Sequence, residues 1–131
     1  MNLRRPQGGA SETPLHDGLP SKAISERKGG MIVVKTPLFK MGQCVATPAA
    51  LRALEEAEQY PWQFLSRHVA GDWGIVDEED KASNDQAVKD GSRILSAYLL
   101  NDGQTKIWII TEATDDQGNR AATTILLPDD Y

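Results

Sequence analysis

Two patterns of apolar positions follow one another along the chain, first at helical spacing and then in alternation. The helical spacing predicts three helices: over Ala49 to Glu58, from Pro61 onward with Trp62, Leu65 and Val69 on one side, and over Asp77 to Asp90. Thr47 and Pro48 supply a capping side chain and a first-turn proline, and Gly91 stands where a helix C-cap is expected. Residues 71–74, Gly-Asp-Trp-Gly, are predicted to form a turn.

Alternation in the last forty residues predicts three strands, over Ser92 to Leu100, Lys106 to Glu112 and Ala121 to Leu127. Asn101-Asp102-Gly103 is typical of a hairpin turn, and residues 115–119 form a longer polar loop. Strands with such short connections pair antiparallel. We therefore expect an α+β fold, with the N-terminal helices packed on one face of a C-terminal three-stranded antiparallel meander.

The first thirty residues lack both patterns. They contain three prolines, five glycines and no aromatic residue, and such a composition does not bury enough apolar surface to offset the entropy of ordering it. We expect a disordered tail over 1–30 and a single α+β domain over 31–131. Met31 opens a short β-branched run, 31–34, which Pro37 limits to an edge strand or arm that would add a fourth strand. Either Met1 or Met31 is the native start.

The composition and charge of the chain argue against several classes of protein. The 131 residues carry a net charge of −5, but the tail contributes +2, so residues 31–131 hold 9 basic and 16 acidic groups. This balance opposes bulk attraction to nucleic acid. The single cysteine, Cys44, excludes an internal disulfide and fits a reducing cytoplasm. No apolar run approaches the roughly 18 residues that a membrane-spanning helix needs, so no membrane association is expected.

Cofactor motifs are missing from the sequence. It contains no glycine-rich phosphate loop and no Gly-x-Ser-x-Gly elbow, and Cys44, His16 and His68 are too scattered for a zinc site. We expect neither a cofactor nor a bound metal, although carboxylates holding a magnesium ion remain an alternative.

Four residues are candidates for catalysis. His68, near the turn, is a candidate general acid, and Glu112, at the end of the second strand, is a candidate general base. Arg93 and Arg120 are candidate phosphate-binding residues. Each also has a structural explanation: a helix C-cap for His68, a solvated strand end for Glu112, an edge-face position beside a half-buried tyrosine for Arg93, and cross-strand pairing with a glutamate such as Glu112 for Arg120.

An acidic segment is the candidate interaction surface. It consists of Asp72 and Trp73 in the turn and of the acidic start of the third helix, Asp77, Glu78, Glu79 and Asp80. The alternative explanation is an ordinary solvated helix face.

From Met31 onward the chain resembles a family of small plasmid-related proteins carried by bacterial plasmids and integrated elements. The resemblance rests on residues 71–74, Asn84-Asp85, residues 93–98, residues 106–113 and residues 123–128 ending at Tyr131. It covers about three quarters of the chain and implies no activity. The loop at 115–119 is longer than in that family, which weakens any fixed register between Glu112 and Arg120.

The helices-then-meander order is also distantly similar to the fold of barnase, EndoU, the tRNA-cutting colicins and RelE-type toxins. That similarity implies RNA cleavage without metal, with Glu112 as base, His68 as acid, and Arg93 or Arg120 on the phosphate. The net charge of −7 over residues 31–131 opposes this function.

Two hypotheses follow from the sequence. The first is a metal-independent ribonuclease-like toxin or effector of a mobile element, with RNA as its partner. The second is a non-catalytic interaction protein, such as an antitoxin, an anti-defence factor or a homodimeric accessory factor, that binds a protein through its acidic helix or a sheet edge.

Overall fold

A computed structural model describes residues 13–14 and 36–131. Its helices are α2 (Pro48–Glu56), α3 (Pro61–Val69), α4 (Glu78–Asp90) and the short 3-10 helix η2 (Pro128–Asp130). Its strands are β1 (Thr13–Pro14), β2 (Gln43–Ala46), β3 (Ile94–Leu99), β4 (Lys106–Thr111) and β5 (Ala122–Leu126). The three predicted helices and the three predicted strands are therefore all present, with ends shifted by a few residues.

The helix ends follow the capping residues in the sequence. The Thr47 hydroxyl accepts a hydrogen bond from the Ala50 amide at 3.2 Å, and Pro48 occupies the first position of α2. The Asp77 carboxylate caps α4 in the same way through the Asp80 amide, at 2.8 Å. Gly91 ends α4 in the left-handed conformation, with φ of 86°, as the sequence predicts.

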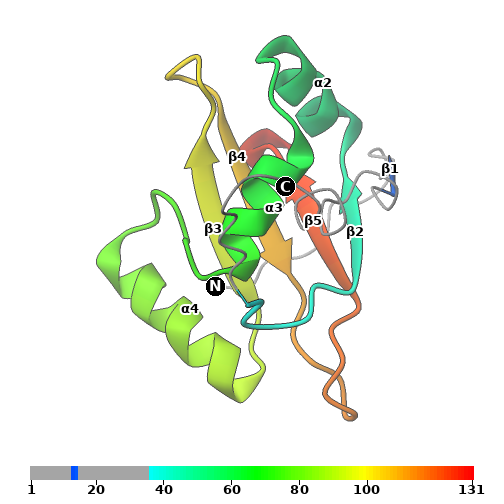
Figure 1. Ribbon diagram of the computed structural model, residues 1–131, viewed down its shortest axis with the longest axis vertical. Helices are drawn as coiled ribbons and strands as arrows, with labels where there is room; N and C mark the ends of the chain where they lie inside the picture. The colour runs from blue at the N-terminus through cyan, green and yellow to red at the C-terminus, as the bar shows by residue number, and fades with distance from the viewer. Residues whose placement is uncertain (1–12, 15–35) are drawn as a thin grey trace, which may run out of the picture.

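The sheet has the order β1-β2-β5-β4-β3 (Figure 1). Strands β3, β4 and β5 form the predicted antiparallel meander. Strand β2, however, runs parallel to β5, with Cys44 opposite Thr123, so the prediction of a purely antiparallel sheet is wrong. A strand of only four residues, ended at once by Thr47 and Pro48, was too short to give a period-2 signal.

The predicted tail and the predicted strand at 31–34 lie almost wholly outside the residues that the structure describes. Within the tail, only Thr13 and Pro14 are described, and they pair antiparallel with β2 at Ala46 and Val45. The division at residue 30 stays a prediction.

The main core lies between the sheet and the helices α2 and α3, and Figure 1 shows α3 crossing in front of the sheet. From α3 the core receives Phe64 and Leu65, and His68 from the same face is fully buried. Trp62, predicted on the buried side, is instead 36% exposed. The buried residues of α3 are Phe64, Leu65 and His68, so of the predicted Trp62, Leu65 and Val69 only Leu65 is fully buried.

The expectation that all helices pack on one face of the sheet is wrong for α4. It lies alongside the outer edge of β3 (Figure 1), and the Asn84 side chain bonds both backbone groups of Leu95, at 2.8 Å to the carbonyl and 3.1 Å to the amide. The chain before α4 covers the same edge, because Ile75 and Trp73 bond the backbone of Ala97 around Gly74. A Cβ on Gly74 would lie 1.8 Å from the Ala97 carbonyl oxygen, so this approach requires glycine.

Candidate functional site

His68 is the polar centre of the core. It lies in the last turn of α3 and is 0% exposed. Its Nδ1 lies 2.6 Å from the Ser96 hydroxyl on β3, and its Nε2 lies 2.8 Å from the Thr111 hydroxyl on β4. Both ring nitrogens are therefore occupied by neutral hydroxyl groups of the sheet.

The hydrogen bonds continue from His68 across the sheet. The Thr111 hydroxyl lies 2.7 Å from the Thr123 hydroxyl on β5, which donates to the Met41 carbonyl at 2.7 Å. A chain of buried polar groups thus runs from Ser96 through His68 to the segment that enters β2. Its members satisfy one another, which is what a buried polar network requires.

The surroundings of His68 keep the imidazole neutral. Burial, and secondly the positive charge of Arg120, lower the pKa of His68 from 6.5 to about 3. The rings of Phe39 and Trp73 pack edge-on against it, with centroids 5.2 Å and 5.9 Å away. General acid catalysis needs a proton that the group can give up near the working pH and access to the substrate; the burial and the lowered pKa of His68 do not favour this role, which stays a prediction from the sequence.

Arg120 joins the end of α4 to the sheet. Its guanidinium donates to three backbone carbonyls: those of Ala87 at 3.1 Å, Ser92 at 2.8 Å and Glu112 at 2.9 Å. Only 6% of the residue is exposed, and burial lowers its pKa. A cation at a helix C-terminus is favoured by the helix dipole. Both terminal nitrogens of Arg120 are therefore engaged by the protein itself.

Glu112 and Arg93 lie at the same end of the sheet as Arg120. The register pairs Ile94 with Thr111, so one step further places Arg93 opposite Glu112. Glu112 meets Arg120 through its backbone carbonyl. Since neighbouring side chains of a strand leave opposite faces, the Glu112 carboxylate points away from the face on which Thr111 meets His68. The structure places Arg93, Glu112 and Arg120 at one end of the sheet, with Arg120 bonded to the Glu112 backbone carbonyl, whereas His68 bonds Ser96 and Thr111 in the core.

Asp72 and Trp73 differ in exposure. The Asp72 carboxylate is exposed, pairs with Arg67 at 2.7 Å and accepts the Gly74 amide at 3.1 Å. Trp73 is only 4% exposed, and its indole nitrogen donates to Asp85 of α4 at 2.9 Å. Trp73 therefore anchors α4 to the core and offers no surface to a partner.

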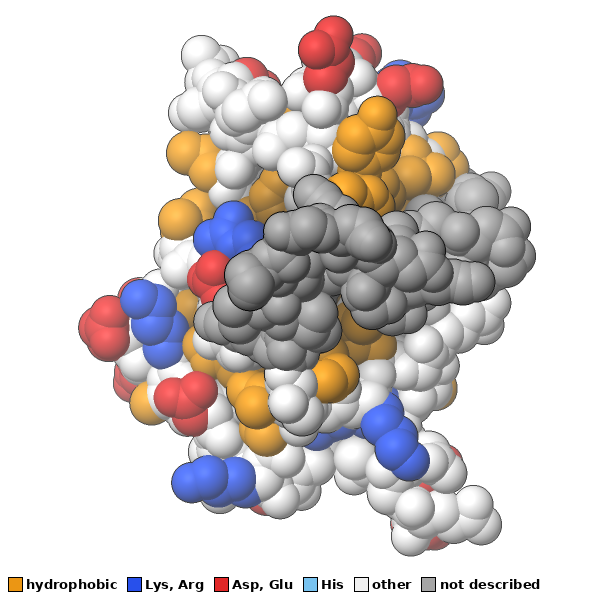
Figure 2. Space-filling view, in the orientation of Figure 1, with side chains coloured by type: hydrophobic (Ala, Val, Ile, Leu, Met, Phe, Trp, Pro, Cys, Tyr) orange, Lys and Arg blue, Asp and Glu red, His pale blue; other side chains and the backbone are white. Residues whose placement is uncertain are grey.

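The first turn of α4 places carboxylates in solvent. Asp77, Glu78, Glu79 and Asp80 are all exposed. Glu78 pairs with Lys81 at 3.3 Å, and Asp77 caps the helix. Figure 2 shows acidic side chains interspersed with basic ones over α4, and further acidic side chains at the end of the molecule where α2 ends. We call the four carboxylates of residues 77–80 the acidic turn.

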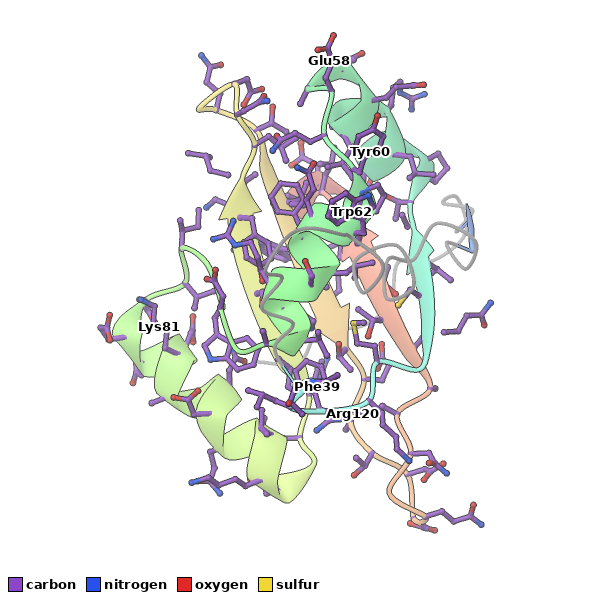
Figure 3. The ribbon with its side chains drawn as sticks, viewed as in Figure 1. Phe39, Glu58, Tyr60, Trp62, Lys81 and Arg120 are labelled. Atoms are coloured by element: carbon purple, nitrogen blue, oxygen red, sulfur yellow. The ribbon has the colours of Figure 1, made fainter. Side chains whose placement is uncertain are left out.

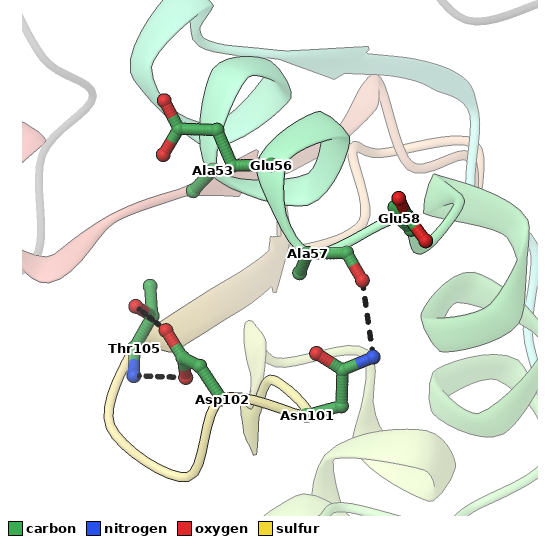
Figure 4. Close-up of a pocket in the computed structure, with 7 residues that line it drawn as sticks. All are labelled: Ala53, Glu56, Ala57, Glu58, Asn101, Asp102 and Thr105. Carbon is green, nitrogen blue, oxygen red and sulfur yellow. Dashed lines mark hydrogen bonds between the residues drawn. The ribbon is translucent and has the colours of Figure 1, made fainter.

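In the sequence, Asn84 stands out only among the residues that carry the family resemblance, and neither its role at the strand edge nor the pocket beside α2 was predicted. Asn84 lies three residues before Ala87, and these two are the buried residues of α4. The pocket lies between the end of α2 and the β3–β4 hairpin (Figure 4). Its residues are far apart in the sequence, and no local pattern connects them.

The described residues contain neither a metal-binding cluster nor a membrane-spanning helix. Within residues 13–14 and 36–131, no group of three histidine, cysteine or acidic side chains is placed to hold a metal ion. In the same part of the chain, no helix has the length and apolar character needed to cross a membrane. Comparisons of the chain with protein-family models, with curated proteins and with solved structures found no match.

Proposed function

We propose that this protein is a non-catalytic interaction protein that binds a positively charged surface of a protein partner through the acidic turn of α4. The observation that carries the proposal is the exposure of all four carboxylates, Asp77, Glu78, Glu79 and Asp80, on a helix whose only buried side chains are Asn84 and Ala87.

Polar anchors hold this helix in place. It has no continuous apolar stripe, so packing alone does not fix it. Three hydrogen-bonded anchors replace the stripe: Asn84 on Leu95, Asp85 on Trp73, and the Ala87 carbonyl on Arg120. A surface held rigidly loses little entropy on binding, which favours affinity and specificity.

The same contacts argue against binding of a partner through the outer edge of β3. The outer edge of β3 is occupied at Leu95 by Asn84 and at Ala97 by residues 73–75. Strand addition at these positions would first have to displace the chain's own groups. We therefore place binding on the acidic turn and not on this edge.

The ribonuclease-like activity stays a prediction from the sequence. The hydrogen-bonded, buried position of His68 and the three carbonyl contacts of Arg120 do not support it. Incubating the purified chain with total RNA, alongside Glu112→Gln, tests it directly. Cleavage that is abolished by Glu112→Gln would favour this activity over our proposal.

The test of the interaction is comparative. A Glu78→Gln/Glu79→Gln variant removes two charges from the acidic turn and leaves the Asp77 cap intact. The matched control, Asp116→Asn/Asp129→Asn, removes two exposed charges elsewhere. Cross-linking in the native host should give one defined partner with the native chain and the control, and lose it with the test variant. A partner retained by the test variant, or lost equally by the control, would exclude the acidic turn.

A further inference from the structure

We draw no further inference here: the strongest candidate, the exposed surface patch formed by the stacked rings of Tyr60 and Trp62 where α2 passes into α3 (Figure 3), carries nothing because no contact in the described part of the chain shows what covers it.

Discussion

The imidazole Nε2 of His68 and the hydroxyl of Thr111 lie 2.8 Å apart, and this hydrogen bond ties the last turn of α3 to the last residue of β4. Together with the bond to Ser96, it makes a buried histidine the main polar link between helix and sheet. The residue that the sequence marks as a candidate acid therefore has a measurable structural role.

Removing the His68 ring should destabilise the fold. His68→Ala leaves a cavity and deprives two buried hydroxyls, of Ser96 and Thr111, of a partner. We expect a loss of about 3 kcal/mol in the free energy of unfolding, measured by urea denaturation. Arg67→Ala, at an exposed position one residue earlier, should cost less than about 1 kcal/mol. A loss of similar size in both variants would contradict the structural role of His68.

The low pKa of His68 makes stability depend on pH in a defined direction. The ring has a pKa of about 3 in the fold against an ordinary value of 6.5, so the unfolded chain binds the extra proton. The stabilisation is complete above pH 6.5 and is lost as the pH falls from 6.5 towards 3, at up to about 1.4 kcal/mol per pH unit.

Urea denaturation at several pH values between 7 and 4 measures this effect. His68→Gln should flatten the pH dependence across that window, because no imidazole then needs to be protonated. The carboxylates with lowered pKa, Asp90, Asp102 and Asp115, titrate in both proteins and cancel in the comparison. Identical pH profiles for the two proteins would show that His68 is not a buried neutral group.

Arg120→Met should have two linked effects. Three carbonyls, of Ala87, Ser92 and Glu112, lose their donor, so stability should fall by about 2 kcal/mol. The loss of the nearby positive charge should also raise the pKa of His68 in the fold, so that stability falls less between pH 6.5 and 4. Thermal unfolding across pH measures both effects, and an unchanged pH slope would argue against the coupling.

Asn84→Ala should loosen the outer edge of β3. The Leu95 amide and carbonyl each lose a partner, at a cost of about 1 to 2 kcal/mol. Hydrogen exchange should become faster at the Leu95 amide, and an unpaired edge should promote self-association. Ser83→Ala, one exposed position earlier on α4, is the control and should leave the exchange rate unchanged.

Glu58→Gly should stabilise the protein by about 0.5 to 1 kcal/mol, because a φ of 57° suits glycine and strains other residues. Glu55→Gly removes the same charge inside α2 and should instead destabilise by about 1 kcal/mol. Denaturant midpoints for the two variants give the comparison. A loss of stability in Glu58→Gly would show that the side chain contributes more than its backbone conformation costs.

Much of the fold could be predicted from local patterns. Thr47 with Pro48, Asp77 and Gly91 mark helix ends through hydrogen bonds within a few residues, and alternation after Ser92 reports strands with one side buried. Strand β2 was not predicted because four residues carry little periodicity. Its parallel pairing with β5 joins segments that lie about eighty residues apart in the sequence. No local signal encodes such a pairing.

For the candidate site residues too, the sequence shows the type of side chain but not its surroundings. Their types were read from the sequence alone: an exposed acidic start to a helix, a histidine beside a turn, and arginines near strand ends. Whether each faces solvent or the core was decided only in three dimensions. His68 and Arg120 bond to groups on distant segments of the chain, whereas residues 77–80 stay exposed and make only local contacts, such as Asp77 with Asp80 and Glu78 with Lys81. Local chemistry determines what a side chain can do, and long-range packing determines what it meets.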